Sequence, residues 1–297
     1  MLSVYHEAQN RAKEHPLHHF HHFYAILVLS TGKVGRCFLS PPQVKNELTH
    51  NSMNFSEISI VIPCYKEEEV IAANILTVYQ YLKKHFERFE IIVVTDGSPD
   101  LTKESVERFG HDHPEVPLVL IPFVKNQGKG AAVKEGVLAS RYDPVLFVDA
   151  DLTISIEELE PFVAALDSAE MAIASRLVSG SSFEEPIPWY RKLLARGFHI
   201  LQILLLGNFQ FPDTQCGFKL FRREVALRLF RRITIKRFAF DAELLFLATH
   251  NGTKVVSLPV TIKKDPRNTN VRPIRDSFNM LFALLKIRWN QISGHYS

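Results

Sequence analysis

The segment LFVDADLT, residues 146–153, joins an apolar run to two aspartates that stand one residue apart. A short apolar run of this kind predicts a buried strand, and the aspartates then stand where the strand ends. Asp149 and Asp151 can both reach one cation from the turn that leaves the strand, and Mg²⁺ and Mn²⁺ prefer oxygen ligands such as carboxylates. A solvated polar strand end explains these residues equally well, so the neighbouring segments have to decide.

An apolar run followed by a polar turn recurs along the chain, with stretches of helical period between the runs. This alternation predicts βαβ units, an α/β fold and a mostly parallel central sheet flanked by helices. Strands are expected at residues 58–62, 90–95, 118–121, 145–148 and 171–174. Helices are expected at residues 67–85, 102–111, 129–140 and 155–166.

The second half of the chain has a different pattern. A long apolar segment with basic residues covers 189–209, and PDTQCGFKLF from Pro212 is expected to form a loop. A helical REVALRLFRR, the acidic and apolar FDAELLFLA, and a strand around 254–260 follow. Since no repeat or low-complexity linker interrupts them, residues 53–297 are expected to form one domain. Residues 1–52 are expected to be a poorly ordered N-terminal extension.

The composition excludes some classes of protein. The 297 residues are 46% hydrophobic, enough for a large core, and their formal net charge is only +3, which argues against a nucleic-acid partner. Cys37, Cys64 and Cys216 are far apart and form no C-x-x-C pair, which indicates a reducing, cytosolic-facing protein. We expect Cys216 to be packed as a small apolar side chain and not to act as a nucleophile.

Four predicted strand ends carry acidic, polar or turn-forming groups, and an open parallel sheet binds its ligands beyond the carboxyl ends of its strands. The four segments are PCYKEE from Pro63, DGSPD from Asp96, KNQGKG from Lys125 and DADLT from Asp149. Their convergence at one edge predicts a binding site there.

Each of these segments also has an explanation without a ligand. Pro63, Tyr65 and Glu67 can line a base and a ribose, or form a proline turn before an acidic helix start. Asp96 can accept from a base N–H, or only initiate a D-G-S turn. The glycines of NQGKG allow close backbone approach at a helix start, where Lys129 adds a charge for a phosphate.

Taken in order, IVIPCYKEEEVI, VVTDGSPD, NQGKGAAVKEG, LFVDADLT, ASR ending at Arg176 and DTQCGFKLFRR resemble family 2 of the glycosyltransferases, which has the Rossmann-like GT-A fold. Within that family the chain is most similar to the polyprenyl-phosphate branch, of the dolichyl-phosphate β-glucosyltransferase type, over residues 56–290. The resemblance implies a UDP-sugar donor and a divalent metal, Mg²⁺ or Mn²⁺, at its diphosphate. It also implies that a dolichyl or undecaprenyl phosphate receives a hexose, here glucose, with inversion.

The resemblance assigns roles to the strand-end residues. The residues that match nucleoside-binding positions are Pro63, Tyr65, Glu67, Asp96 and Lys129. Asp149 matches a ribose or metal contact, and Asp151 matches the principal metal ligand. Mannose synthases of the family often have a further metal ligand two residues later, where this chain has Thr153.

The acceptor side offers several candidates. Asp213 matches the position of a catalytic base in this branch, although an aspartate that only caps a turn explains it too. Asp241 and Glu243 are the second candidates for a base, and an acidic helix start explains them almost as well. Arg176 and Lys219 can hold the diphosphate or the lipid phosphate, or form surface salt bridges. A phosphate acceptor is already ionised near neutral pH, so it needs less help from a base than a hydroxyl does.

Two segments are candidates for membrane contact. Residues 190–206 and 275–289 mix basic and apolar side chains, as in helices that lie at a bilayer surface, but buried core helices fit equally well. No apolar stretch reaches the roughly 20 residues that cross a bilayer, whereas many relatives carry such spans. We therefore expect peripheral attachment to the cytosolic face of a membrane. Asn270 stands where relatives often have a basic residue, which Arg267, Arg272 or Arg275 can replace.

Two other functions fit the motifs. A family 2 transferase that glycosylates a saccharide hydroxyl often has a late Gln-x-x-Arg-Trp motif, which this chain lacks. A nucleotide-sugar-binding pseudoenzyme is disfavoured because both aspartates of DADLT are present. The oligomeric state stays open.

Overall fold

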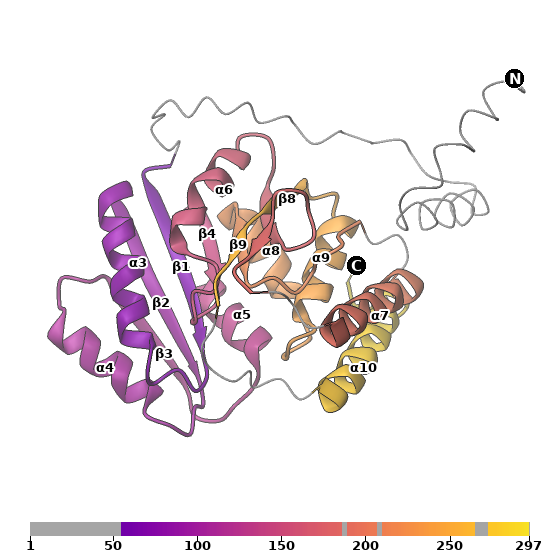
Figure 1. The fold of residues 1–297 in the computed structure, drawn as a ribbon, viewed down its shortest axis with the longest axis horizontal. Helices are drawn as coiled ribbons and strands as arrows, with labels where there is room; N and C mark the ends of the chain where they lie inside the picture. The colour runs from indigo at the N-terminus through magenta and orange to yellow at the C-terminus, as the bar shows by residue number, and fades with distance from the viewer. Residues whose placement is uncertain (1–54, 186–188, 207–209, 265–272, 297) are drawn as a thin grey trace, which may run out of the picture. The chain divides into compact units, whose positions relative to one another are not determined.

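The segment EISIVIPC forms strand β1, Glu57–Cys64, which lies inside a seven-stranded sheet. β1 pairs with β2 on one edge and with β4 on the other, and helices cover both faces of the sheet (Figure 1). The continuous apolar run that predicted the strand is thus explained by burial on both faces. The computed structural model describes residues 55–185, 189–206, 210–264 and 273–296, without the side chains of 189–192, 194–195 and 273–278.

The sheet has the strand order β3-β2-β1-β4-β7-β5-β8. Its other strands are β2 (Arg88–Asp96), β3 (Leu118–Phe123), β4 (Val145–Val148), β5 (Met171–Ser175), β7 (Phe218–Phe221) and β8 (Val255–Pro259). β7 runs antiparallel to both β4 and β5, and all other pairs are parallel. A separate parallel pair is formed by β6 (Ser182–Phe183) and β9 (Thr261–Ile262).

The helices form two layers, because alternate strand residues point to opposite faces of the sheet. Ile58, Ile60 and Ile62 pack against one layer, and Val61 packs against the other. The first layer contains α3 (Ile71–His85), α4 (Thr102–Asp112), the short 3₁₀ helix η1 (Ile156–Glu158) and α6 (Leu159–Ala165). The second contains α5 (Lys129–Ala139), α7 (Trp189–Leu206), α8 (Arg223–Arg232), α9 (Phe240–His250) and α10 (Pro273–Ile292).

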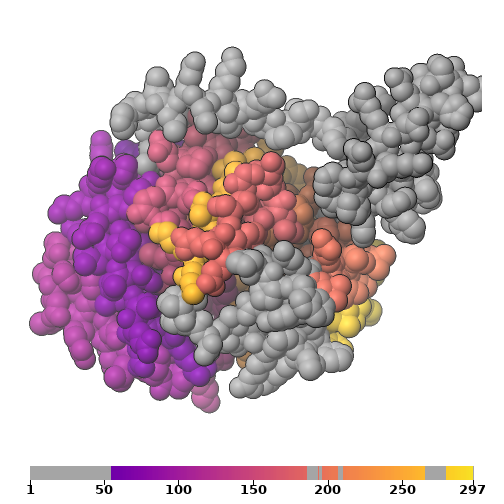
Figure 2. Space-filling view, viewed as in Figure 1, coloured from indigo at the N-terminus to yellow at the C-terminus, as the bar shows by residue number. Residues whose placement is uncertain are grey.

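The surface follows the order of the chain. In the space-filling view, atoms of the first βαβ units gather on the left and those of later segments on the right (Figure 2). The two halves meet inside the sheet, where β4 pairs with β7. Ser52–Ser297 form one compact unit. The expected extension at 1–52 lies outside the described residues and stays a prediction.

The structure confirms the five strands predicted in the first part of the chain and the strand predicted around 254–260, and it corrects two of the predicted helices. The helix expected from Glu67 begins at Ile71 because residues 68–70 form a turn. The helix expected over 155–166 is divided into η1 and α6.

The expectation of a loop over PDTQCGFKLF was wrong for its last four residues, which form β7. This strand is short and has a buried charge, Lys219, at its second position, so it lacks the apolar pattern of the other strands. Its extended form depends on pairing with both β4 and β5, which local sequence does not reveal.

Candidate active site

The predicted strand ends meet at one edge of the sheet. Since β1 pairs with β2 on one side and with β4 on the other, the strand order changes direction between β1 and β4. In open α/β sheets this switch point is where ligands bind, beyond the carboxyl ends of the strands. Cys64, Asp96 and Val148 end β1, β2 and β4 at this edge, and the antiparallel β7 begins there at Phe218.

The turn after β4 holds the two aspartates. The Leu152 N–H donates to the Asp149 carbonyl (3.2 Å), and the Thr153 N–H donates to Asp151 Oδ1 (3.0 Å). Leu152 has a φ of 47°, a left-handed conformation that costs a non-glycine residue energy and is enriched at functional sites. Asn74 of α3 donates its side-chain N–H to the Ala150 carbonyl (2.7 Å). The turn is therefore fixed from within and from α3.

The electrostatics of this turn favour a cation. Burial and, next, the charge of Asp149 raise the pKa of Asp151 above its ordinary value, so its negative charge lacks compensation. Lys129 donates to Asp149 Oδ1 at 2.6 Å from the first position of α5. Burial lowers the pKa of Lys129, but Asp149 and Asp241 outweigh it and keep the ammonium charged. Thr153 supports Asp151 through its backbone N–H.

A glycine makes room for the first aspartate. The Asp149 N–H donates to the Gly217 carbonyl (3.0 Å), which continues the β4–β7 pairing by one residue. A Cβ added at Gly217 would lie 1.9 Å from Asp149 Oδ2. Only glycine fits here without moving the carboxylate. We assigned Gly217 no role from the sequence, because the glycine of DTQCGFK has no side chain that suggests one.

The loops after β1 and β2 are tied to each other. The Lys66 N–H donates to Ser98 Oγ (2.7 Å), and the Glu67 N–H donates to Thr102 Oγ1 (2.9 Å). Tyr65 is exposed beside them. Pro63, expected to shape the turn, is instead buried within β1, because the strand extends to Cys64.

Asp96 organises the next loop. Its carboxylate accepts from the N–H groups of Gln127 (2.7 Å) and Gly128 (2.8 Å) and from the side chain of Asn126 (2.9 Å). Burial raises the pKa of Asp96 in spite of these hydrogen bonds. The carboxylate thus holds the backbone that leads into Lys129. Its expected contact with a base stays a prediction.

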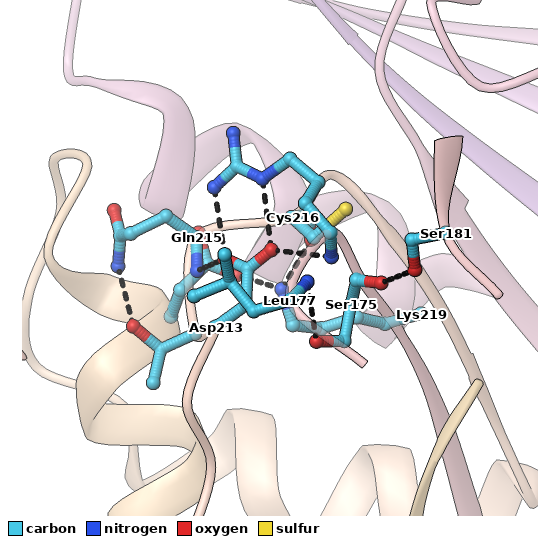
Figure 3. Close-up of polar contacts among 10 residues, drawn as sticks. Ser175, Leu177, Ser181, Asp213, Gln215, Cys216 and Lys219 are labelled. Carbon is cyan, nitrogen blue, oxygen red and sulfur yellow. Dashed lines mark hydrogen bonds and ion pairs between the residues drawn. The ribbon is translucent and has the colours of Figure 1, made fainter. Parts of the chain in front are cut away.

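Arg176 and Asp213 form a bidentate ion pair (Figure 3). Arg176 Nε and Nη2 donate to the two carboxylate oxygens at 2.8 Å, and the Arg176 backbone N–H adds a third bond of 2.8 Å. Burial raises the pKa of Asp213, but Arg176 outweighs it and holds the pKa below its ordinary value. A carboxylate in this state is a poor proton acceptor at neutral pH.

Lys219 and Asp241 form a second ion pair, which is fully enclosed. Lys219 Nζ donates to Asp241 Oδ1 and to the Cys216 carbonyl, each at 2.5 Å, and neither side chain reaches the surface. We expected Lys219 to hold a phosphate or to form a surface salt bridge. Both expectations are corrected, because the side chain is buried and pairs with Asp241. Glu243, the other second-choice base, accepts from Thr234, Ile235 and Tyr296 and is structural.

Cys216 is buried, as expected, and burial raises the pKa of its thiol to about 12. Cys64 is also buried, and both thiols are free. Asn270, Arg267 and Arg272 lie outside the described residues, as does the side chain of Arg275, so the proposed replacement of a basic residue stays a prediction.

A doubly wound sheet with an acidic pair at the end of β4 is the architecture expected of the GT-A fold. The model of "Glycosyl transferase family 2" matches residues 59–230, a range that contains all four strand-end segments and β7. The chain belongs to this family, as its motifs predicted.

The relatives agree with this assignment, and a solved structure shares the fold. A dolichyl-phosphate beta-glucosyltransferase of Trichomonas vaginalis is 37% identical over 68% of this chain and 62% of that protein. The dolichyl-phosphate beta-glucosyltransferase of Homo sapiens is 35% identical over 80% of this chain and 76% of that protein. The glucosyl-3-phosphoglycerate synthase of Mycobacterium tuberculosis, solved with Mn²⁺, UDP-glucose and glycerol 3-phosphate, has a TM-score of 0.55 at 20% identity, covering 78% of this chain and 80% of that chain. The chain spans less than two thirds of two Trichomonas relatives, 62% and 64%.

Gly217→Ala should disturb the acidic turn. The added methyl group must displace the Asp149 carboxylate or the β7 backbone, so we expect a loss of about 1–3 kcal/mol in the free energy of unfolding, together with weaker Mn²⁺-dependent UDP binding. Urea denaturation and calorimetric titration measure the two effects. The control Gly197→Ala places its methyl group in open space on α7 and should stabilise the helix. Equal behaviour of the two variants would contradict this account of Gly217.

The lowered pKa of Asp213 predicts a pH-dependent contribution to stability. Because the folded pKa lies below the ordinary value of 3.8, the carboxylate stabilises the fold above that pH, and the contribution is lost as the pH falls through the folded pKa. We expect Asp213→Asn to be less stable than the wild type by about 1–3 kcal/mol at neutral pH. Urea denaturation at a series of pH values should show this gap narrowing below about pH 4; a gap that does not change on acidification argues against the ion pair.

Proposed function

We propose that the protein transfers glucose from UDP-glucose to the phosphate of a polyprenyl lipid of the dolichyl type, with inversion at the anomeric carbon. The names of the two relatives support the sugar and the acceptor class. Both also belong to the branch that the motifs of the chain resemble. The arrangement of charges at the carboxyl edge of the sheet supports each half of the reaction.

The donor side suits a nucleoside diphosphate with a divalent metal. Asp149 and Asp151 supply hard oxygen ligands, and the parts of the chain that the structure describes contain no cluster of three or more acidic, histidine or cysteine ligands. Two carboxylates completed by phosphate oxygens and water are the ligand set that Mg²⁺ and Mn²⁺ accept. The M. tuberculosis synthase, solved with Mn²⁺ and UDP-glucose, supports the same donor chemistry. When bound, the ion neutralises the charge that grows on the departing diphosphate.

The chain's own groups prepare the donor pocket. Lys129 fixes Asp149 by a 2.6 Å ion pair and keeps its positive charge near the acidic turn. Asp96 shapes the loop that carries Lys129. Tyr65 and Glu67 lie at the end of β1, at the same edge, where they are positioned to contact the nucleoside.

The ion pairs of the two candidate bases, Asp213 and Asp241, support a phosphate as the acceptor. A hydroxyl acceptor has a proton to lose in the transition state, and a positioned base normally takes it. Asp213 is held by three donors of Arg176, and Asp241 is enclosed with Lys219. A phosphate oxygen needs no such base, because it is already ionised near neutral pH. The paired carboxylates therefore favour a phosphate acceptor over a saccharide hydroxyl.

Arg176 is positioned to bind that phosphate. Its side chain is 38% exposed while that of Asp213 is 4% exposed, so the guanidinium lies on the open side of the pair. A guanidinium presents several donors in one plane and matches the oxygens of a phosphate. Asp213 then orients Arg176, and the carboxylate itself takes no proton.

Helices α7 and α10 supply a surface that suits a bilayer. They pack together, side by side at the edge of the fold (Figure 1). On α10, Phe282 (67% exposed), Trp289 (69%) and Ile292 (69%) form one apolar stripe, and Lys286 and Arg288 are exposed beside it. Apolar side chains with flanking cations are typical of helices that lie in the headgroup region.

Among the described helices, none combines the length and the apolar character that a membrane crossing requires. Because exposed apolar and basic side chains lie together on α10, we propose that the protein meets its lipid through the α7–α10 surface, on the cytosolic face of a membrane.

The activity can be tested directly. Radiolabelled UDP-glucose and dolichyl phosphate, incubated with the protein and Mn²⁺ or Mg²⁺, should yield labelled lipid on solvent extraction. Asp151→Asn should lower kcat/KM by about a hundredfold, because a charge that stabilises the leaving group is lost. Asp112→Asn, an exposed position at the end of α4, serves as the control. Undiminished transfer in EDTA, or transfer only to saccharide hydroxyls, would reject the proposal.

Membrane contact can be tested separately by liposome flotation. Trp289→Ser should weaken binding to vesicles that contain anionic lipid by about tenfold, since a large apolar side chain contributes at least 1.5 kcal/mol when it leaves water, by an order-of-magnitude estimate. Leu101→Ser removes an apolar side chain of similar exposure, 60%, from the loop before α4 and should leave flotation unchanged. If both variants float like the wild type, α10 is not the contact.

A further inference from the structure

The ion pair between Lys219 and Asp241 lies next to the acidic turn but does not reach it. Lys219 is 0% and Asp241 is 2% exposed, so neither side chain can touch a substrate in this arrangement. A buried ion pair is weak evidence of stabilisation, because desolvation offsets most of the attraction between its charges. The position of the pair, in the core between β7 and α9, therefore calls for another explanation.

Hydrogen bonds connect the pair to the site. Lys219 Nζ donates to the Cys216 carbonyl at 2.5 Å (Figure 3). This carbonyl belongs to the peptide group that joins Cys216 to Gly217. Gly217 in turn accepts from the Asp149 N–H (3.0 Å) and provides the space that the Asp149 carboxylate fills. The carbonyl that Lys219 holds and the Gly217 residue that Asp149 contacts therefore belong to one peptide unit.

Electrostatics connect the pair to the same aspartate from the other side. Lys219 and Lys129 both approach the ring of Phe147, at 5.8 and 5.3 Å from its centroid. Lys129 pairs with Asp149 at 2.6 Å, and Lys219 pairs with Asp241 at 2.5 Å. The Lys129–Asp149 and Lys219–Asp241 ion pairs therefore lie next to the same ring.

We propose that Lys219 and Asp241 are positioning residues that fix the Cys216–Gly217 peptide, and thereby the orientation of the Asp149 carboxylate, for metal-dependent nucleotide binding. The inference rests on the proposed function, since it concerns the same donor site. Lys219 supplies the hydrogen bond that anchors the peptide. Asp241 holds the lysine in place and balances its charge.

The test separates positioning from stability. Lys219→Met and Asp241→Leu each leave one buried charge unpaired and should lower the Tm strongly, whereas the double variant removes both charges and should recover most of that Tm. Calorimetric titration with UDP is carried out with and without Mn²⁺. We expect the double variant to bind UDP about 10–100-fold more weakly in the presence of Mn²⁺, as for other residues that orient a metal ligand, and to bind UDP alone as the wild type does.

Glu90→Gln is the matched control. Glu90 is a buried carboxylate near the start of β2, paired with Arg141 and Ser59 at the other end of the sheet. This variant should lose Tm without losing Mn²⁺-dependent affinity. Where the double variant fails to fold, Asp241→Asn replaces it, because it keeps the side-chain volume and an acceptor for Lys219. A smaller loss of Mn²⁺-dependent affinity is expected for Asp241→Asn.

The outcomes distinguish the inference from the function on which it rests. If the folded double variant, or Asp241→Asn in its place, binds UDP with Mn²⁺ as tightly as the wild type, the positioning role is overturned and the donor site stands. An equal loss of UDP affinity with and without Mn²⁺ also overturns it, since general damage would then explain the result. If the wild type shows no Mn²⁺-dependent binding of UDP, the proposed function itself fails.

Discussion

The carboxylate of Asp149 lies against the Cα of Gly217, and the geometry of the site depends on this contact. The contact exists because β7 runs antiparallel between β4 and β5, so that its first residues face the end of β4. The hydrogen bond from Asp149 to the Gly217 carbonyl extends that pairing beyond the strand. The position of the first acid is thus set by the one antiparallel strand in the seven-stranded sheet.

Paired charges surround this contact, and they leave negative charge at one place. Arg176 compensates Asp213, Lys219 compensates Asp241, and Lys129 donates to Asp149. Asp151 has Asp149 beside it, and burial together with the charge of Asp149 raises the pKa of Asp151. In a partly desolvated turn this excess of negative charge favours a cation. Because Asp213 and Asp241 are held in ion pairs, they are poor bases. An acceptor that is already ionised, such as a phosphate, needs no base.

Much of the fold could be predicted from the sequence. Buried parallel strands are continuous apolar runs ended by polar turns, which is why residues 58–62 and 145–148 indicated strands that the structure confirms. The motifs at those ends also identified the family that the comparison confirms. Strand β7 could not be predicted in this way, since Lys219 interrupts its apolar pattern and both of its partners lie far from it in the chain.

The sequence by itself determined which chemical groups stand at the strand ends: the acids of DADLT, the lysine of NQGKG, the arginine of ASR and the aspartate of DTQCGFK. Only the tertiary structure decided which of them meet. Arg176 and Asp213 are 37 residues apart, and Lys219 and Asp241 are 22 residues apart. Asp213 reaches Arg176 because β7 pairs with β5 and brings the loop before β7 to the end of β5, and Asp241 reaches Lys219 because α9 packs on the face of the sheet to which Lys219 points. Neither arrangement can be read from the local periodicity of the segments.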